Sequence, residues 1–172
     1  GRSSAPIVFQ ADDTFVQQLD FVAGWQWISF NLMSTDLSST DILFQGLSAS
    51  DGDQIKGIEG VDVFTAANGW SGSLSGLDPE QMYKLYLSES GSIRFKGSEI
   101  VPSTRNIPIV EGWNWLGFIP SVNMSVSEAL SSLNSTSGDI IKSQLQFAVY
   151  EQGIGWLGSL KSLKPGAGYM LN

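Results

Sequence analysis

Gly24-Trp25-Gln26-Trp27-Ile28 recurs 88 residues later as Gly112-Trp113-Asn114-Trp115-Leu116. Farther along the chain, residues 52–85 match residues 138–171 without a gap, with 14 identities in 34 positions. The period is far longer than that of ordinary solenoid repeats. The sequence therefore predicts two copies of one unit. We place a linker or tag remnant at 1–5, unit one at 6–91 and unit two at 92–172, and expect the units to pack as one pseudo-symmetric domain.

Each unit also opens with a similar short segment. Ile7 and Phe9 match Ile93 and Phe95 at an offset of 86 residues. Their spacing of two places both apolar side chains on one face of a strand. We therefore predict a first strand at 7–10, followed by a turn and a second strand at 15–22.

The remaining pattern predicts a mainly β fold. Short apolar runs alternate with Gly- and Ser-rich turns, which is typical of many short strands. One short helix is expected in each unit, at 37–47 and at 125–133, and Ser125 and Glu128 form a capping-box pattern at the second. Parallel βαβ winding would need more helices. We therefore predict an internally duplicated antiparallel β-sandwich or barrel with one short helix per repeat.

Composition excludes several functional classes. The chain contains no histidine and no cysteine, which removes Ser-His-Asp and Cys-His nucleophiles and most zinc sites. No run of about 18 apolar residues is present, so no membrane span is expected. The formal net charge is −8, and residues 6–91 carry 12 acidic and 2 basic side chains. Because phosphate binding needs a basic surface, a nucleic-acid partner is not expected.

Carboxylates are the remaining catalytic groups, and a glycosidase would need two of them facing one scissile bond. The acids that match between the units are Asp53 with Asp139 and Asp41 with Glu128. Each is expected to lie far from its counterpart. We therefore predict a protein that is not an enzyme, and keep a carboxylate-based glycoside hydrolase as the weakest of three hypotheses.

One acidic turn has the character of a calcium site. Asp51 and Asp53 flank Gly52, and closely spaced carboxylates can supply hard oxygen ligands. Unit two has one acid fewer at the matching turn. The alternative is a turn in which Asp53 accepts backbone N–H bonds. No cofactor is otherwise expected.

The six tryptophans form three repeat-matched pairs: Trp25/Trp113, Trp27/Trp115 and Trp70/Trp156. Tryptophan on a strand can anchor a core, whereas exposed tryptophan can stack on sugar rings. We assign the first two pairs mainly to the core. The third pair follows a glycine in a turn, where side chains are more often exposed. The candidate ligand-binding residues are therefore Trp70, Trp156, Tyr83 and Tyr150.

These motifs resemble a repeat of large secreted or surface proteins of Bacteroidetes-type bacteria. Unit two carries the pattern at 112–118, 138–142, 155–160 and 163–169, whereas unit one lacks both glycines of the closing motif, at 79–83. The resemblance implies an accessory module that accompanies other extracellular domains. It implies no particular binding residues.

Three hypotheses of function follow. The first is a secreted or cell-surface module of a larger bacterial protein that is carbohydrate-binding or adhesive, with a polysaccharide or cell-surface glycan as its partner. The second is a structural spacer or protein-interaction module without a small ligand, which contacts neighbouring domains of a parent protein. The third is the hydrolase. Exposed aromatic side chains beside hydrogen-bonding groups would favour the first hypothesis over the second.

Overall fold

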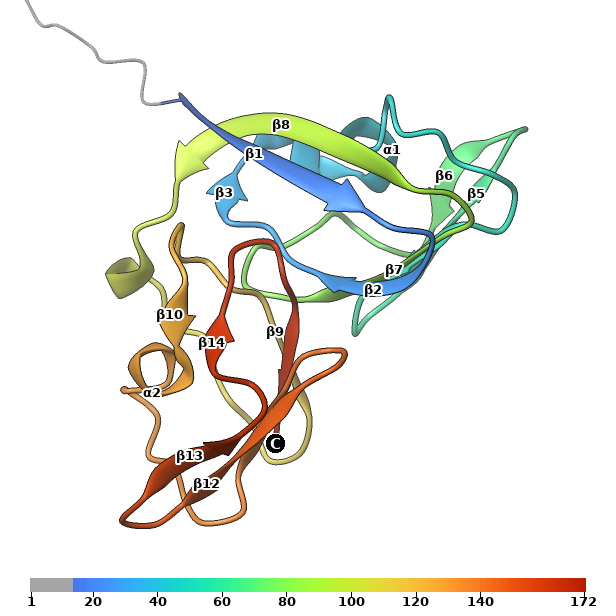
Figure 1. The fold of residues 1–172 in the computed structure, drawn as a ribbon. Coiled ribbons are helices and arrows are strands. Elements are labelled where there is room, and N and C mark those ends of the chain that lie inside the picture. The colour runs from blue at the N-terminus through green and yellow to red at the C-terminus, as the bar shows by residue number, and fades with distance from the viewer. Residues whose placement is uncertain (1–13) are drawn as a thin grey trace, which may run out of the picture.

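The structure is a computed structural model that describes residues 14–172. The predicted mainly β fold is confirmed: the described chain forms antiparallel sheets with two short α-helices, and the sheets do not close into a barrel (Figure 1). The strand predicted at 7–10 lies outside the described residues. The strand predicted at 15–22 is present as β1 (Thr14–Phe21).

A five-stranded sheet in the order β2-β7-β4-β5-β6 forms the centre of the first half of the chain. Its strands, listed in that order, are β2 (Gly24–Ile28), β7 (Tyr83–Leu87), β4 (Gln54–Lys56), β5 (Val61–Thr65) and β6 (Gly69–Gly72).

A second layer lies over this sheet (Figure 1). It is a three-stranded sheet in which β8 (Gly91–Glu99) lies between β1 and β3 (Leu32–Met33). Strands β1 and β8 pair over their lengths, from Thr14 opposite Ser98 to Phe21 opposite Gly91. Apolar side chains of both layers form one core, which includes Phe30, Ile55, Leu85 and Phe95. The first half is therefore a two-layer sandwich.

The second half contains a five-stranded sheet with the same arrangement of matching strands. In the order β9-β15-β11-β12-β13, its strands are β9 (Asn114–Leu116), β15 (Tyr169–Leu171), β11 (Ile140–Lys142), β12 (Phe147–Glu151) and β13 (Gly155–Gly158). Beside it, the described residues form the two-stranded pair of β10 (Met124–Ser125) and β14 (Ser162–Leu163), against which the second helix packs.

The predicted helices are present but shorter than expected. Helix α1 covers Thr40–Leu43 after a 3-10 turn η1 (Thr35–Ser38), and α2 covers Val126–Ala129; a second 3-10 turn, η2, covers Pro102–Thr104. The capping prediction at α2 is confirmed, because Ser125 and Glu128 hydrogen-bond reciprocally. The same bonds lower the pKa of Glu128. The predicted lengths were wrong because serine and glycine, which follow each short apolar run, are weak helix formers.

Several hydrogen bonds recur in both halves at the repeat offset. Ser29 N donates to Gly166 O over 3.0 Å, and its counterpart Gly117 N donates to Glu80 O over 2.9 Å. These two bonds cross between the halves, and an isolated bridge joins Ile28 to Ala167 beside them. The edge strands β2 and β9 of the two large sheets are thereby held near each other. No helix within residues 14–172 is long and apolar enough to span a membrane.

Candidate binding surface

The structure reverses the expected roles of the tryptophan pairs. Trp70 is 6% exposed and belongs to the first core, where its ring centroid lies 4.9 Å from that of Phe44 and 5.6 Å from that of Phe64. Tyr83 is 2% exposed and contacts Phe30 in the same core. The prediction that Trp70 and Tyr83 bind ligand is therefore wrong, because neither ring has a face open to solvent.

Trp156 and Tyr150 are only half-buried. Their ring centroids lie 5.4 Å apart in an edge-to-face arrangement, and Trp156 packs against the second core. The four residues that we predicted as one ligand site therefore divide between two cores and do not form a common surface. The signal that misled the prediction is the glycine before each tryptophan: Gly69 lets the chain turn so that the Trp70 side chain enters the core beneath α1.

Tyr83 has a structural role that can be measured. Its hydroxyl accepts a 2.7 Å hydrogen bond from Asp78 N, and burial raises its pKa to about 12. The unfolded pKa is near 10, so stability should be full below about pH 10 and fall by about 2–3 kcal/mol as the pH approaches 12. Urea unfolding across this range measures the loss. In Tyr83→Phe the free energy of unfolding should depend less on pH over this range. An unchanged pH dependence in that variant would contradict the assignment.

The predicted calcium ligands serve the backbone instead. Asp53 is 1% exposed and accepts hydrogen bonds from Ser50 N at 3.0 Å and Ser88 N at 2.8 Å, while Asp51 accepts one from Ala66 N at 2.6 Å. Within residues 14–172, no group of three or more His, Cys, Asp or Glu side chains is arranged to hold a metal ion. The calcium interpretation is therefore corrected to a hydrogen-bonded turn, because the oxygens of Asp53 point at backbone donors.

The other two tryptophan pairs lie on an outer surface. Trp25 is 42% exposed and Trp113 is 41% exposed, while Trp27 and Trp115 are partly exposed. Alternation in β2 explains this: Ile28 points into the core, so the tryptophans one and three positions before it point away. The assignment of these pairs to the core was wrong, since both faces of the strand carry apolar residues and only one face is covered.

Three lysines stand among these rings. Lys56 Nζ lies 5.2 Å from the centre of the Trp25 ring, and Lys142 Nζ lies 4.1 Å from that of Trp113. These two contacts are repeat equivalents. We call this surface the Trp–Lys face, and it comprises Trp25, Trp27, Trp113, Trp115, Lys56, Lys84 and Lys142.

Lys84 joins the two halves of this surface. Its Nζ lies 5.1 Å from the ring centre of Trp27 and 4.4 Å from that of Trp115, so it contacts one tryptophan from each large sheet. Lys142 Nζ also lies 6.0 Å from Trp27. Cation–π contacts of this kind hold both partners in place. The Trp–Lys face is thus one continuous surface across β2, β7, β4, β11 and β9.

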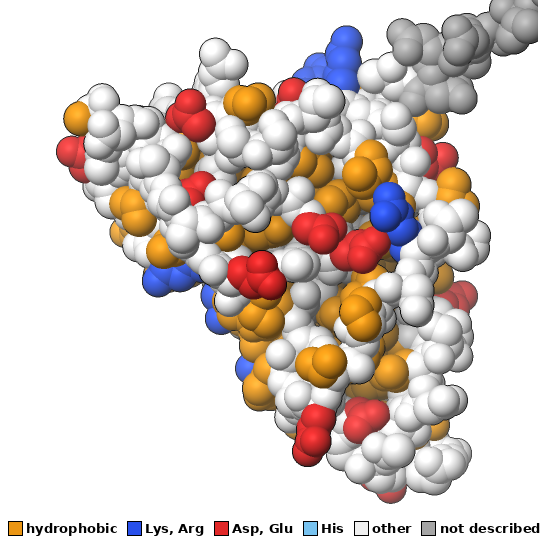
Figure 2. All heavy atoms as spheres, turned by 180° about the vertical axis from the view of Figure 1, so that it is seen from behind, with side chains coloured by type: hydrophobic (Ala, Val, Ile, Leu, Met, Phe, Trp, Pro, Cys, Tyr) orange, Lys and Arg blue, Asp and Glu red, His pale blue; other side chains and the backbone are white. Residues whose placement is uncertain are grey.

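No acidic side chain of residues 14–172 forms an ion pair with any of the three lysines. The one ion pair within residues 14–172 joins Arg105 to Glu80, away from these lysines. Partial burial lowers the pKa of Lys84, and repulsion from Lys142 and Lys56 adds to the shift. In Figure 2, basic side chains lie beside hydrophobic ones along one edge, whereas acidic side chains are scattered over the face in view. An anion placed among these lysines would relieve their mutual repulsion.

The sequence did contain a signal for this surface. Lys56 and Lys142 occupy the same position of the repeated Gly-Asp-x-Ile-Lys segment, and each follows a fully buried isoleucine in its strand. A lysine next to an inward residue must point outward. What could not be inferred is that Lys84, which has Met170 as its counterpart, completes the surface. No family model, curated protein or solved structure matches the chain.

Proposed function

We propose that the chain is a non-catalytic module of a larger extracellular bacterial protein, and that it binds an acidic polysaccharide on the Trp–Lys face. The observation that supports this most directly is that three lysines, which form no ion pair within the described part of the chain, lie between four tryptophan rings on one surface. Such a surface offers both flat apolar platforms and fixed positive charge. A sugar chain that carries carboxylate or sulfate groups has the complementary chemistry.

The aromatic part of the surface suits sugar rings. Trp25 and Trp113 each keep about two fifths of their surface open to solvent, although a lysine lies over each ring. Tyr86 lies 5.3 Å from Trp25 and widens that platform. The rings are fixed by the sheet and by the lysines, so little conformational entropy is lost when a ligand stacks on them. Rings held at fixed positions would also suit a polymer of repeating sugar units, such as a polysaccharide.

The charges favour an acidic ligand over a neutral one. The whole chain has a net charge of −8, yet three of its six lysines gather here. A net negative protein repels most polyanions at long range, so binding would depend on the local lysines and on contact with the rings. The affinity should therefore fall as salt is added, since exposed charges are screened.

The four repeat-matched acids support a non-catalytic role. Asp41 accepts a hydrogen bond from Trp70 N, Glu128 caps α2, and Asp53 and Asp139 accept bonds from backbone N–H groups. Each is therefore used to hold a turn or a helix end. The spacer hypothesis remains the alternative, because stacked Trp and Lys side chains can also stiffen the junction between the halves.

Titration of intrinsic fluorescence with polysaccharides tests the proposal. We expect saturable binding of polygalacturonate or of a sulfated glycan such as heparin, and none of neutral dextran. Trp113→Ala and Lys142→Gln should each weaken binding by about tenfold or more, as removal of an anchor side chain does. Lys96→Gln removes an exposed lysine of β8 and is the matched control that should bind normally.

The other outcomes discriminate between the hypotheses. No binding of any polysaccharide by the folded protein would favour the spacer. Equal binding of a single-stranded oligonucleotide, or equal loss in Lys96→Gln, would show a general attraction of polyanions and contradict a glycan site. Circular dichroism of every variant establishes that it is folded.

A further inference from the structure

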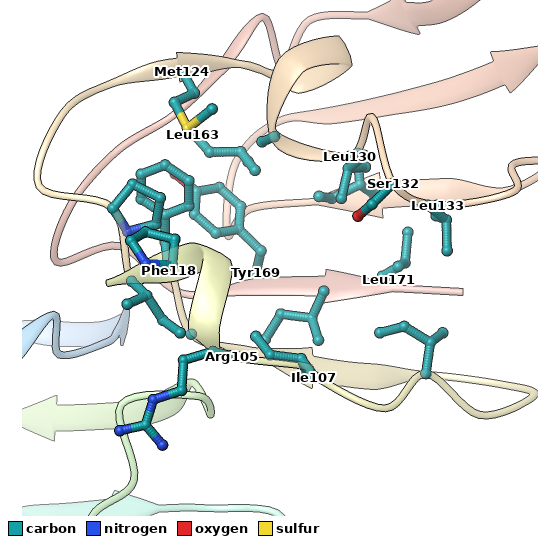
Figure 3. A pocket seen from close by; sticks show the side chains of 18 of the residues that line it. Arg105, Ile107, Phe118, Met124, Leu130, Ser132, Leu133, Leu163, Tyr169 and Leu171 are labelled. Atoms are coloured by element: carbon teal, nitrogen blue, oxygen red, sulfur yellow. The ribbon is translucent and has the colours of Figure 1, made fainter. Parts of the chain in front are cut away.

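A second feature of the surface is an apolar groove in the second half of the chain. It has a volume of about 450 Å³ and lies between the segment 102–109 and strand β15, which carries Tyr169 and Leu171, with Phe118 beside them. Figure 3 shows these side chains facing Ile107 across the groove, with Leu133 farther along it and Arg105 pointing away. Hydrophobic side chains are also visible on the lower half of the face in Figure 2. The groove is independent of the Trp–Lys face.

The equivalent surface of the first half is covered. There, β1 contributes Leu19 and Phe21 to the core, and the neighbouring β8 contributes Ile93 and Phe95. The Phe95 ring centroid lies 5.9 Å from that of Phe30. All of these side chains are less than a tenth exposed. Two adjacent strands thus close the first core.

Among the described residues of the second half, β1 has a counterpart in the segment 102–109, whereas β8 has none. Leu19, Phe21 and Phe30 correspond to Ile107, Ile109 and Phe118 at the offset of 88. Ile109 is 42% exposed, whereas Phe21 is 4% exposed. Within residues 14–172, no strand pairs with 102–109 as β8 pairs with β1. The groove therefore lies where the second core would receive a strand like β8.

We propose that residues 6–11 of the same chain occupy this groove as a strand antiparallel to 103–109. This segment is the repeat counterpart of β8, because Ile7 and Phe9 match Ile93 and Phe95. In β8 these two side chains point inward and Arg94 between them points outward. Ile7 and Phe9 would likewise enter the groove, and Val8 would face away.

The register follows from the pairing in the first half. Leu19 lies opposite Ile93 there, and their counterparts are Ile107 and Ile7. Ile7 would therefore lie opposite Ile107. Phe9 would reach Phe118, which is the counterpart of the contact between Phe95 and Phe30.

The connection is short enough to form within one chain. Thr14 is paired with Ser98, four residues before η2 begins at Pro102. Figure 1 shows the start of β1 beside the end of β8. Because β1 and β8 are antiparallel, residues that precede Thr14 can continue alongside those that follow Ser98. Seven residues of extended chain, from Thr14 back to Ile7, span about 23 Å at 3.3 Å each.

Paired cysteines in the full chain test this assignment, since the sequence contains none. We expect Ile7→Cys with Ile107→Cys to form a disulfide under mild oxidation at the mass of the monomer, because directly opposed strand residues are close enough to bridge. Val8→Cys with Ile107→Cys is the matched control and should remain largely reduced. Absence of the first disulfide, equal formation in the control, or a disulfide-linked dimer would each overturn the proposal, the last by making a second copy the occupant.

Thermal unfolding of variants without added cysteine provides a second test, which applies even if a cysteine variant misfolds. Phe9→Asp should lower the midpoint of thermal unfolding by several degrees, since it places a charge in an apolar groove. Val8→Asp should leave the midpoint nearly unchanged. Equal midpoints in the two variants would contradict docking of this segment.

Discussion

Replacing Trp70 by alanine should lower the free energy of unfolding by about 3–5 kcal/mol, as expected for loss of a large buried aromatic side chain. The ring is 6% exposed and packs between Phe44 and Phe64, so its removal leaves a cavity that the two-layer core can fill only in part. Urea unfolding followed by circular dichroism measures the change.

Two matched variants make the test specific. Trp70→Phe keeps much of the packing and removes an indole nitrogen that has no hydrogen-bond partner in the described structure, so it should cost far less than alanine. Trp25→Ala removes a ring that is 42% exposed, and should alter stability by less than about 1 kcal/mol while weakening polysaccharide binding. The opposite result, with Trp70→Ala stable and Trp25→Ala unfolded, would contradict the assigned roles.

Replacing Asp53 by alanine should also be costly, by about 3–4 kcal/mol, because two backbone donors lose a charged acceptor. Its two carboxylate oxygens join Ser50 to Ser88 and thereby fix the turn before β4 to the end of β7. The carboxylate is 1% exposed, so water cannot replace these bonds without opening the structure. Thermal or urea unfolding of the variant measures the loss.

The second half provides the control for this prediction. Asp139 occupies the matching position and accepts bonds from Thr136, but it is only partly buried and its hydrogen bonds lie at the surface. Asp139→Ala should therefore cost no more than about 1 kcal/mol. Added calcium should not change the stability of the unaltered protein, and a calcium-dependent rise that is lost in Asp53→Ala would restore the metal interpretation.

Local features of the fold were accessible from the sequence. The hydrogen bonds of Ser125 and Glu128 involve residues three positions apart, so the capping box was visible in four letters of sequence. At α1 the Ser39 hydroxyl likewise accepts a hydrogen bond from Ile42 N at 3.1 Å, again across three residues. The lengths of the helices were overestimated, because the prediction extended each helix across the serine and glycine that follow its short apolar run.

The candidate site was less accessible, for a physical reason that Trp25 and Trp70 illustrate. Both are tryptophans beside a glycine, in strands at the edges of the same sheet. Packing by α1 covers Trp70, whereas no other layer covers Trp25 within the described residues. The helix and the tryptophan that it covers are 27 residues apart in the chain, counted from Leu43 to Trp70. This contact between α1 and Trp70 cannot be predicted from local composition or from periodicity.

The sequence by itself determined the mainly β fold, the turns and caps, and which residues of each strand share a face, since strand geometry alternates side chains with a period of two. Only the tertiary structure decided which face of each sheet is covered, and therefore which tryptophans are core and which are surface. It also decided that Lys84 of β7 meets Trp115 of β9. Such choices arise from contacts between segments far apart in the chain, where the free energy of burying a face depends on the layer that packs against it.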